Sequence, residues 1–180
     1  MLLLSGALFL SACSTSDTAA TQVDDPIPSW FTNPPEDHNY IFVPRVASSR
    51  DLQTAINRAT TDARTEIGRV MEVRMESMQE NFTEEAGVDE DATFRQMFEE
   101  VSRTVVATSM NDSRVRETKR EREGNIWRAY ILMEYPIGAA NQQFVNQMKE
   151  REEMYTRFRQ SQSFRELERA VEDYERRQGN

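Results

Sequence analysis

Three alanines that recur every four residues, Ala55, Ala59 and Ala63, place the tightest constraint on how this chain can fold. They lie on the apolar stripe of a segment with helical periodicity, which predicts an amphipathic α-helix over residues 51–68. Because alanine side chains are short, the buried face of this helix must lie close to the element it covers. A β-sheet is the simplest such element, so the sequence predicts a helix packed on a sheet.

The ends of this helix and the element that follows it are also indicated by the sequence. Ser48 and Asp51 resemble a capping pair, and Gly68 is a residue type at which helices commonly end. Apolar and charged residues then alternate over residues 70–78, which predicts a half-buried β-strand. Residues 79–91 are rich in Asp and Glu and are expected to form a mobile acidic loop.

The central and edge strands of the sheet are predicted from residues 111–135. This segment has the pattern of a hairpin whose two-residue turn begins with Gly124, and that turn places Glu121 opposite Arg128. The first strand of the hairpin is almost wholly polar, so we place it at an edge of the sheet. The second strand is apolar enough to be central.

Two further elements complete the expected domain. Residues 40–47 are typical of a short strand, and Pro44 within it cannot donate a ladder hydrogen bond, which indicates an edge position or a bulge. Residues 92–108 predict a second helix, whose inner face carries five apolar side chains: Phe94, Met97, Phe98, Val101 and Val105.

The C-terminal residues 139–180 predict a long helical extension. Ser163 and Glu166 resemble a capping box that begins its last helix. The extension is charged enough to stand partly free of the domain, yet its aromatic stripe must be buried against its own domain or a second copy. With two aromatic residues near the N-terminus, this stripe supplies the candidate interaction residues: Trp30, Phe31, Phe144, Tyr155, Phe158, Phe164, Leu167 and Tyr174.

The first thirteen residues carry the clearest functional signal. Residues 1–12 form an apolar run too short to cross a bilayer, which takes roughly 20 residues, and they have the character of a signal-peptide core. The run ends in Leu10-Ser11-Ala12-Cys13, which matches the bacterial lipobox. We therefore expect cleavage between Ala12 and Cys13, with a diacylglyceryl group on the Cys13 thiol and an acyl chain such as palmitate on its amino group. A buried apolar segment with an incidental cysteine is the alternative interpretation.

The residues around the anchor predict its setting. No Lys or Arg precedes the apolar run, so we expect the natural start to lie upstream. Ser14, where an aspartate would favour retention at the inner membrane, favours the outer membrane of a Gram-negative bacterium. Residues 14–25 are small and polar and predict a flexible linker. Residues 26–35 hold four prolines and are expected to be extended, with Trp30 and Phe31 packed on the domain as a clasp or, alternatively, exposed as a docking site.

The elements together predict the α+β class: a small antiparallel sheet of three to four strands, packed by one or two helices and followed by a long C-terminal helical extension. The expected division of the chain has four parts: residues 1–12 as signal peptide, residues 13–25 as lipidated linker, residues 26–138 as the α+β domain and residues 139–180 as the helical extension.

Composition narrows the function classes. The formal net charge of −9 argues against a nucleic-acid binder, and one cysteine and one histidine leave no ligand set for a transition metal. Five acidic residues could bind calcium weakly but lack the spacing of a calcium loop: Glu84, Glu85, Asp89, Glu90 and Asp91. His38 is expected in a solvated loop and Glu134 at a strand end that reaches solvent. We therefore expect no enzyme, no metal and no cofactor beyond the covalent lipid.

The order of these elements, behind a lipobox and a Pro-x-Trp-Phe-x-x-Pro-Pro segment, resembles the LPP-twenty family of bacterial lipoproteins. More distantly it resembles the flagellar assembly lipoproteins P and T. The matching residues are Pro28, Trp30, Pro35, residues 40–47, Ala55, Ala59, Ala63 and residues 130–136. The resemblance covers residues 28–138. It implies an outer-membrane lipoprotein with a small α+β domain that tends to self-assemble, and it implies no catalytic residues.

Two functions are compatible with these expectations. The first is a structural or scaffolding lipoprotein of the cell envelope, anchored by its lipid and facing the periplasm, which forms a homo-oligomer or binds an envelope protein. The second is a periplasmic binding module for peptidoglycan, a lipid or an envelope protein partner, including a flagellar basal-body accessory. The first predicts self-association of the folded part, and the second predicts a monomer with a concave apolar pocket.

Overall fold

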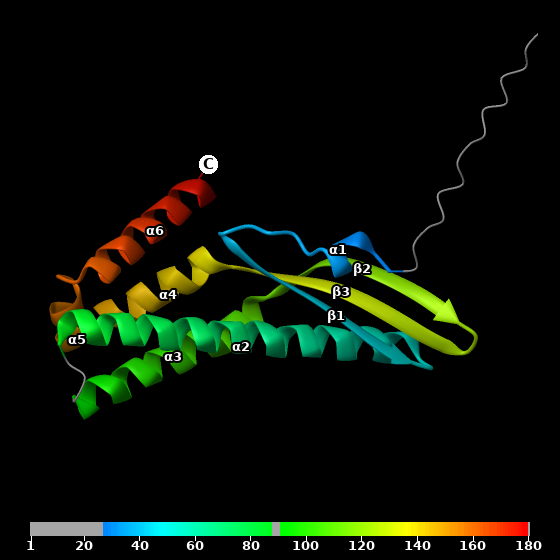
Figure 1. Ribbon diagram of the computed structural model, residues 1–180, viewed down its shortest axis with the longest axis horizontal. Helices are drawn as coiled ribbons and strands as arrows, with labels where there is room; N and C mark the ends of the chain where they lie inside the picture. Colours follow the sequence, from blue (N-terminus) through cyan, green and yellow to red (C-terminus); the bar gives the residue numbers. More distant parts are fainter. Residues whose placement is uncertain (1–26, 88–90, 180) are drawn as a thin grey trace, which may run out of the picture.

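The computed structural model describes residues 27–87 and 91–179 and has the predicted α+β fold (Figure 1). Three strands form one antiparallel sheet in the order β1-β3-β2: β1 (Tyr40–Ser49), β2 (Arg114–Glu123) and β3 (Ile126–Pro136). The helices are α1 (Ser29–Thr32), α2 (Leu52–Ala86), α3 (Ala92–Asp112), α4 (Ile137–Lys149), α5 (Glu152–Phe158) and α6 (Gln162–Gln178). The sheet lies toward one end of an elongated molecule, and most helices gather at the other end (Figure 1).

The sheet confirms the positions predicted for three of its strands. The apolar strand β3 is central, and β1, with its proline, and the polar strand β2 form the two edges. Gly124 has φ +60°, which suits the first position of the predicted two-residue turn. Glu121 lies opposite Arg128 as expected. However, the Arg128 guanidinium lies 3.6 Å from the carboxylate of Glu123 and forms its ion pair there.

The helix predicted for residues 51–68 is in fact the first half of α2, which is 35 residues long. The predicted strand over residues 70–78 and the predicted loop over residues 79–86 are therefore wrong. Ile67, Met71 and Met75 follow one another every four residues and are at most 2% exposed, so they continue the alanine stripe. Val73, which the alternating pattern placed on the buried side, is 59% exposed. The alternation is too short to exclude a helical period, and the tertiary packing selects the helix.

The ends of α2 also differ from the prediction. Asp51 is the N-cap residue and accepts a hydrogen bond from the backbone N–H of Thr54 at 2.7 Å, so Ser48 is not part of the cap. Gly68 does not end the helix. A β-carbon at that position would lie 2.7 Å from the sulfur of Met110, so glycine there lets α3 approach closely. The helix ends at Gly87, which has the left-handed φ of +64°.

The second predicted helix, α3, extends four residues beyond its expected end, to Asp112. Its N-cap is Asp91, a residue assigned from sequence to the acidic loop, whose carboxylate accepts a hydrogen bond from the backbone N–H of Phe94 at 3.0 Å. Four of the five predicted inner side chains are buried, and the fifth, Met97, is partly buried against the core. Asp89 and Glu90 lie outside the described residues.

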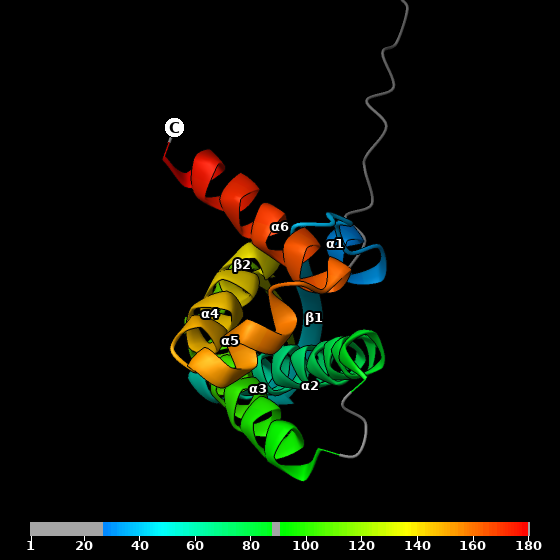
Figure 2. The ribbon, with the colours of Figure 1, turned by 90° about the vertical axis from the view of Figure 1, so that its left-hand side faces the viewer.

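The helices after Gly138 turn back along the molecule instead of standing free (Figure 2). Helix α6 begins two residues earlier than the predicted capping box implies: Ser161 is its N-cap and accepts a hydrogen bond from the backbone N–H of Phe164 at 3.1 Å. Ser163 instead donates its hydroxyl to Glu85 of α2 at 2.5 Å. Within the described part of the chain, no helix combines the length and the apolar character that crossing a membrane takes.

The proline-rich N-terminal segment is not fully extended, because residues 29–32 form the short helix α1. This segment lies on the face of the sheet opposite α2 (Figure 1). The ring of Phe31 contacts that of Tyr130 on β3, with centroids 5.2 Å apart and an edge-to-face orientation. The ring of Trp30 is in turn edge-on to Phe31, so the clasp arrangement is the one observed.

Candidate functional site

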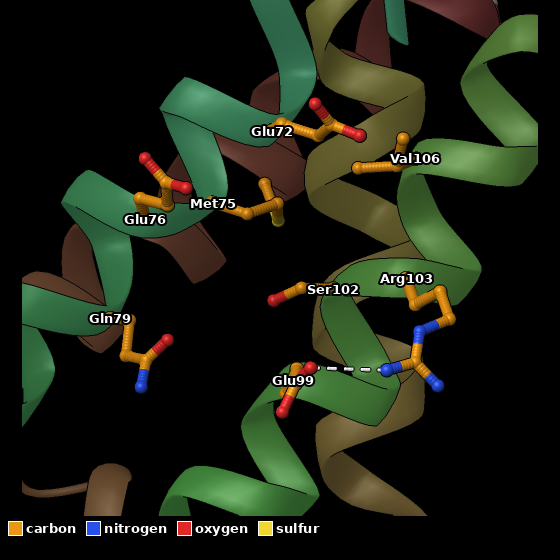
Figure 3. Close-up of a pocket in the computed structure, with 8 residues that line it drawn as sticks. All are labelled: Glu72, Met75, Glu76, Gln79, Glu99, Ser102, Arg103 and Val106. Carbon is orange, nitrogen blue, oxygen red and sulfur yellow. Dashed lines mark hydrogen bonds and ion pairs between the residues drawn. The ribbon is translucent and has the colours of Figure 1, made fainter. Parts of the chain in front are cut away.

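A groove lies between α2 and α3 in the described structure (Figure 3). Its volume is about 390 Å³. One wall comes from the C-terminal half of α2 and the other from α3, and the lining residues are Glu72, Met75, Glu76, Gln79, Glu99, Ser102, Arg103 and Val106. The two helices lie side by side along this groove because the glycine at position 68 and the apolar stripe of α2 bring α3 close.

The floor of the groove is apolar with one unsatisfied polar atom. Met75 is 2% exposed and Val106 is 9% exposed, so both side chains close the bottom of the groove. The hydroxyl oxygen of Ser102 is buried and has no hydrogen-bond partner among the described residues. In Figure 3 this hydroxyl points from α3 toward α2. A buried hydroxyl without a partner has a free-energy cost, so a donor reaching the floor would be favoured.

The rim of the groove is acidic. Glu99 is paired with Arg103, with an oxygen–nitrogen distance of 3.1 Å. Glu72 and Glu76 have no ion-pair partner within residues 27–87 and 91–179, and they stand one helical turn apart on α2. An adjacent hollow continues the groove past Glu80 and Arg95. Two like charges at this spacing destabilise a helix slightly, so the groove favours a cationic ligand.

A second hollow of about 270 Å³ lies where α2, α4 and α6 meet. The Arg74 guanidinium donates a hydrogen bond to the amide oxygen of Asn141 at 3.2 Å. The Nε atom of Arg74 is buried and has no hydrogen-bond partner among the described residues. Burial lowers the pKa of Arg74 because the charged form is desolvated. Glu166 lines the same hollow and accepts a hydrogen bond from the side chain of Gln162.

The sequence suggested that Glu134 lies at a strand end that reaches solvent, and the structure shows that this prediction is wrong. Glu134 is 6% exposed, and its two oxygens accept hydrogen bonds from Arg114 at 2.7 Å and Arg116 at 3.0 Å. The Arg116 guanidinium also lies over the ring of Phe42, 5.1 Å from its centroid. In this arrangement two cationic side chains of the edge strand satisfy both oxygens of the carboxylate.

The aromatic residues predicted to mediate interactions lie mostly inside the molecule. Phe144, Phe158 and Phe164 are fully buried, and Leu167 is 8% exposed. Tyr155 packs against Phe164, and the Tyr174 ring lies on Gly138, where an added β-carbon would be 2.2 Å from it. Trp30 and Phe31 are half-buried in the clasp. The stripe that the sequence indicated is therefore buried within its own chain.

Other predicted residues are placed as follows. The side chain of His38 is 89% exposed in the loop before β1, as expected. Among residues 27–87 and 91–179, no group of three or more His, Asp and Glu side chains is arranged to hold a metal ion. The lipidation residue Cys13 and the cleavage residue Ala12 lie outside the described residues.

The groove was not predicted because its α2 wall, which includes Glu72, Met75 and Glu76, was assigned to a strand instead of a helix. Glu72 and Glu76 were placed on the solvent side of that strand, and Ser102 was not singled out. One pattern in the sequence indicates this row of carboxylates on a helix: Glu72, Glu76, Glu80 and Glu84 recur every four residues, close to the helical period.

Comparison with models of known protein families, with curated proteins and with solved structures found no match to this chain. The groove, its unpaired carboxylates and the N-terminal sequence are therefore the features from which a function can be argued.

Proposed function

We propose that this protein is a bacterial lipoprotein, anchored to the cell envelope by lipid on Cys13, with a structural or scaffolding role in which its folded part self-assembles. The observation that carries the proposal is the sequence Leu10-Ser11-Ala12-Cys13 at the end of an apolar run. Each buried CH₂ group of an acyl chain contributes about 0.8 kcal/mol, so two or three chains hold a protein on its membrane. The chain is not proposed to be an enzyme.

Several observations support the position and the role. Ser14 follows the anchor residue and favours the outer membrane, with the folded part in the periplasm. The resemblance to the LPP-twenty lipoproteins that the sequence suggests over residues 28–138 implies self-assembly. The polar residues 14–25 give the folded part reach from the membrane, so it can contact neighbours.

The anchor is tested with Cys13→Ser in the native host. Wild-type protein is expected in the membrane fraction with the added mass of its acyl chains, and Cys13→Ser is expected to lose that mass. Ser16→Ala is the matched control, since it changes a nearby linker serine and leaves the lipobox intact. A Cys13→Ser protein that stays with the membrane, together with wild-type protein that has no acyl mass, would rule the proposal out.

The membrane is tested with Ser14→Asp. We expect this variant to keep its acyl mass and to move from the outer-membrane to the inner-membrane fraction on a density gradient. Ser16→Asp adds the same charge two residues further on and is expected to leave the distribution unchanged. Equal distributions for wild type and Ser14→Asp would remove the outer-membrane part of the proposal.

A binding module for an envelope protein is the second candidate, and the groove between α2 and α3 favours it. Such a module is expected to remain a monomer at all concentrations. Sedimentation of the full chain in a mild detergent separates the two functions, because only the scaffold shows mass that rises with protein concentration.

A further inference from the structure

Two oppositely charged surfaces of this chain lie too far apart to neutralise each other. We propose that the α2–α3 groove of one copy receives the β2–β3 hairpin of a second copy, so that copies assemble head to tail. The inference rests on the self-assembly in the proposed function and names the contact that produces it. The partner is therefore a second copy of this chain, and the recognised groups are two arginines.

The groove supplies the negative half of the contact. Residues 72–87 contain five glutamates and one arginine. Glu72 and Glu76 project from α2 beside the groove, and Figure 3 shows their carboxylates at its edge. No cation among the described residues lies within ion-pair distance of either carboxylate. The apolar floor and the unpartnered Ser102 hydroxyl add a surface that an amphipathic segment with N–H donors would fill.

The hairpin supplies the positive half. Residues 114–128 contain six Arg or Lys residues and three glutamates. Arg120 and Arg122 are two positions apart on β2, so they point to the same face of the strand. Arg122 stacks on Trp127, 5.2 Å from the ring centroid, and Arg120 has no ion-pair partner in the described structure. One guanidinium stacked on an indole ring and a second on the same face of the strand match two carboxylates beside an apolar floor.

The geometry requires a second copy. The hairpin turn and the acidic half of α2 lie toward opposite ends of the molecule's long axis (Figure 1). The hairpin of one chain therefore cannot enter its own groove. A contact between two different surfaces of identical chains is heterologous, and it produces an open row or a ring instead of a closed two-fold dimer.

Because the lipid anchor holds copies on one membrane, a weak groove–hairpin contact is sufficient for them to associate. Exposed ion pairs contribute little singly and are screened by salt, so the contact is expected to be weak in dilute solution. Copies tethered to one membrane are held at a high effective concentration, which favours association without any additional contact. Direct pairing of two β2 strands is less favourable: centred on Lys119, it would place Glu117 opposite Glu121.

The test is a charge exchange in the full chain, purified from membranes in a mild detergent and followed by sedimentation at low salt. Glu72→Lys with Glu76→Lys is expected to weaken self-association at least about tenfold, and so is Arg120→Glu with Arg122→Glu. An equimolar mixture of the two double variants retains one complementary pair, Lys in the groove with Glu in the hairpin, and is expected to recover association. The chain with all four changes is expected to associate within about threefold of wild type.

Matched controls reverse charge elsewhere on the surface. Glu172→Lys and Arg169→Glu lie on exposed positions of α6 and alter the net charge in the same directions, so they are expected to leave association unchanged. As a geometric readout, a mixture of Glu76→Cys and Arg122→Cys chains is expected to form a disulfide-linked dimer. Wild-type chains measure any background from Cys13.

Each other result overturns the inference in a distinguishable way. Wild-type self-association that survives both charge reversals removes the groove–hairpin contact and leaves the scaffold proposal standing. A wild type that is monomeric at every concentration removes the self-assembly on which the inference rests. If the groove reversals release a different envelope protein while the hairpin reversals have no effect, the second-copy assignment is wrong. If the hairpin reversals reduce only binding to anionic vesicles, the hairpin contacts lipid instead.

Discussion

The two ends of this molecule are built in opposite ways. At the helical end, six phenylalanine side chains are each at most 1% exposed, and they come from α2, α3, α4, α5 and α6. At the hairpin end, every residue of β2 is exposed or half-buried, and eight of its ten residues are charged. The large buried aromatic side chains that stabilise the fold are therefore concentrated at the helical end. The other end is free to carry charge for contacts.

Phe82 is the centre of the helical end. Its ring lies between 5.2 and 6.4 Å from the rings of Phe98, Phe144, Phe158 and Phe164, so it joins five helices. Phe82→Ala is expected to lower the free energy of unfolding by about 3–5 kcal/mol, because it removes a fully buried side chain and leaves a cavity. Chemical denaturation measures this loss.

The control for Phe82→Ala lies on the same helix. Val73 is 59% exposed, and Val73→Ala is expected to change the free energy of unfolding by no more than about 0.5 kcal/mol. Equal losses for the two variants would contradict the concentration of stability at the phenylalanine cluster.

The next largest effect is expected at the contact between α4 and α6. The Tyr174 ring lies on Gly138, where a β-carbon would meet the ring and its Cβ at 2.2–2.8 Å. Gly138→Ala is therefore expected to cost about 1–3 kcal/mol through overpacking, although alanine is the better helix former. Adding Tyr174→Ala to Gly138→Ala should remove most of the overpacking term, as a double-mutant cycle would show. Independent, additive losses would mean that α6 is not seated on this glycine.

The cap of α6 gives a smaller effect. Ser161→Ala removes the N-cap hydrogen bond to the backbone N–H of Phe164 and is expected to cost about 1 kcal/mol. Ser163→Ala, which removes only an exposed hydrogen bond to Glu85, is expected to cost less. Thermal unfolding of both variants distinguishes them, and a larger loss for Ser163→Ala would restore the cap position that the sequence suggested.

The sequence predicted some elements correctly and others not, depending on whether the apolar pattern fits one period or two. Segments with one clear period were predicted correctly: the hairpin with its turn at Gly124, the edge strand containing Pro44 and the helix on which Phe94 and Phe98 lie. Met71, Val73 and Met75 fit both a strand and a helix. Packing against α3 decided between them, and packing is not a local property of the sequence.

The groove could not be predicted for a related reason. Its walls belong to two helices, and their approach depends on Gly68 in the middle of α2 facing Met110. A glycine at that position looks like a helix end when only local sequence is considered. Glu72 and Glu76 line the groove only because α2 continues past Gly68, so their role could not be predicted from a helix that ends there.

A pH effect is expected where α2 meets α6. Hydrogen bonds from the side chain and backbone of Ser163 hold the pKa of Glu85 below its ordinary value of 4.5. A lowered pKa in the folded state means that Glu85 stabilises the fold above pH 4.5 and that this stabilisation is lost as the pH falls through the folded-state pKa. Wild type and Glu85→Gln are expected to differ in melting temperature at neutral pH and to converge in acid. Glu80→Gln, which changes an exposed glutamate on the same helix, is the matched control.

The smallest effect on stability is expected at the hairpin, and it completes the contrast between the two ends. Arg120 is exposed and has no ion-pair partner in the described structure, so Arg120→Glu is expected to change the free energy of unfolding by no more than about 0.5 kcal/mol. Denaturation of the monomer at high salt measures this without any contribution from association. A stable, folded Arg120→Glu chain makes lost association attributable to a surface contact. A loss of several kcal/mol would instead show that the charged strand supports the fold, and the division between a stabilising end and a contacting end would be wrong.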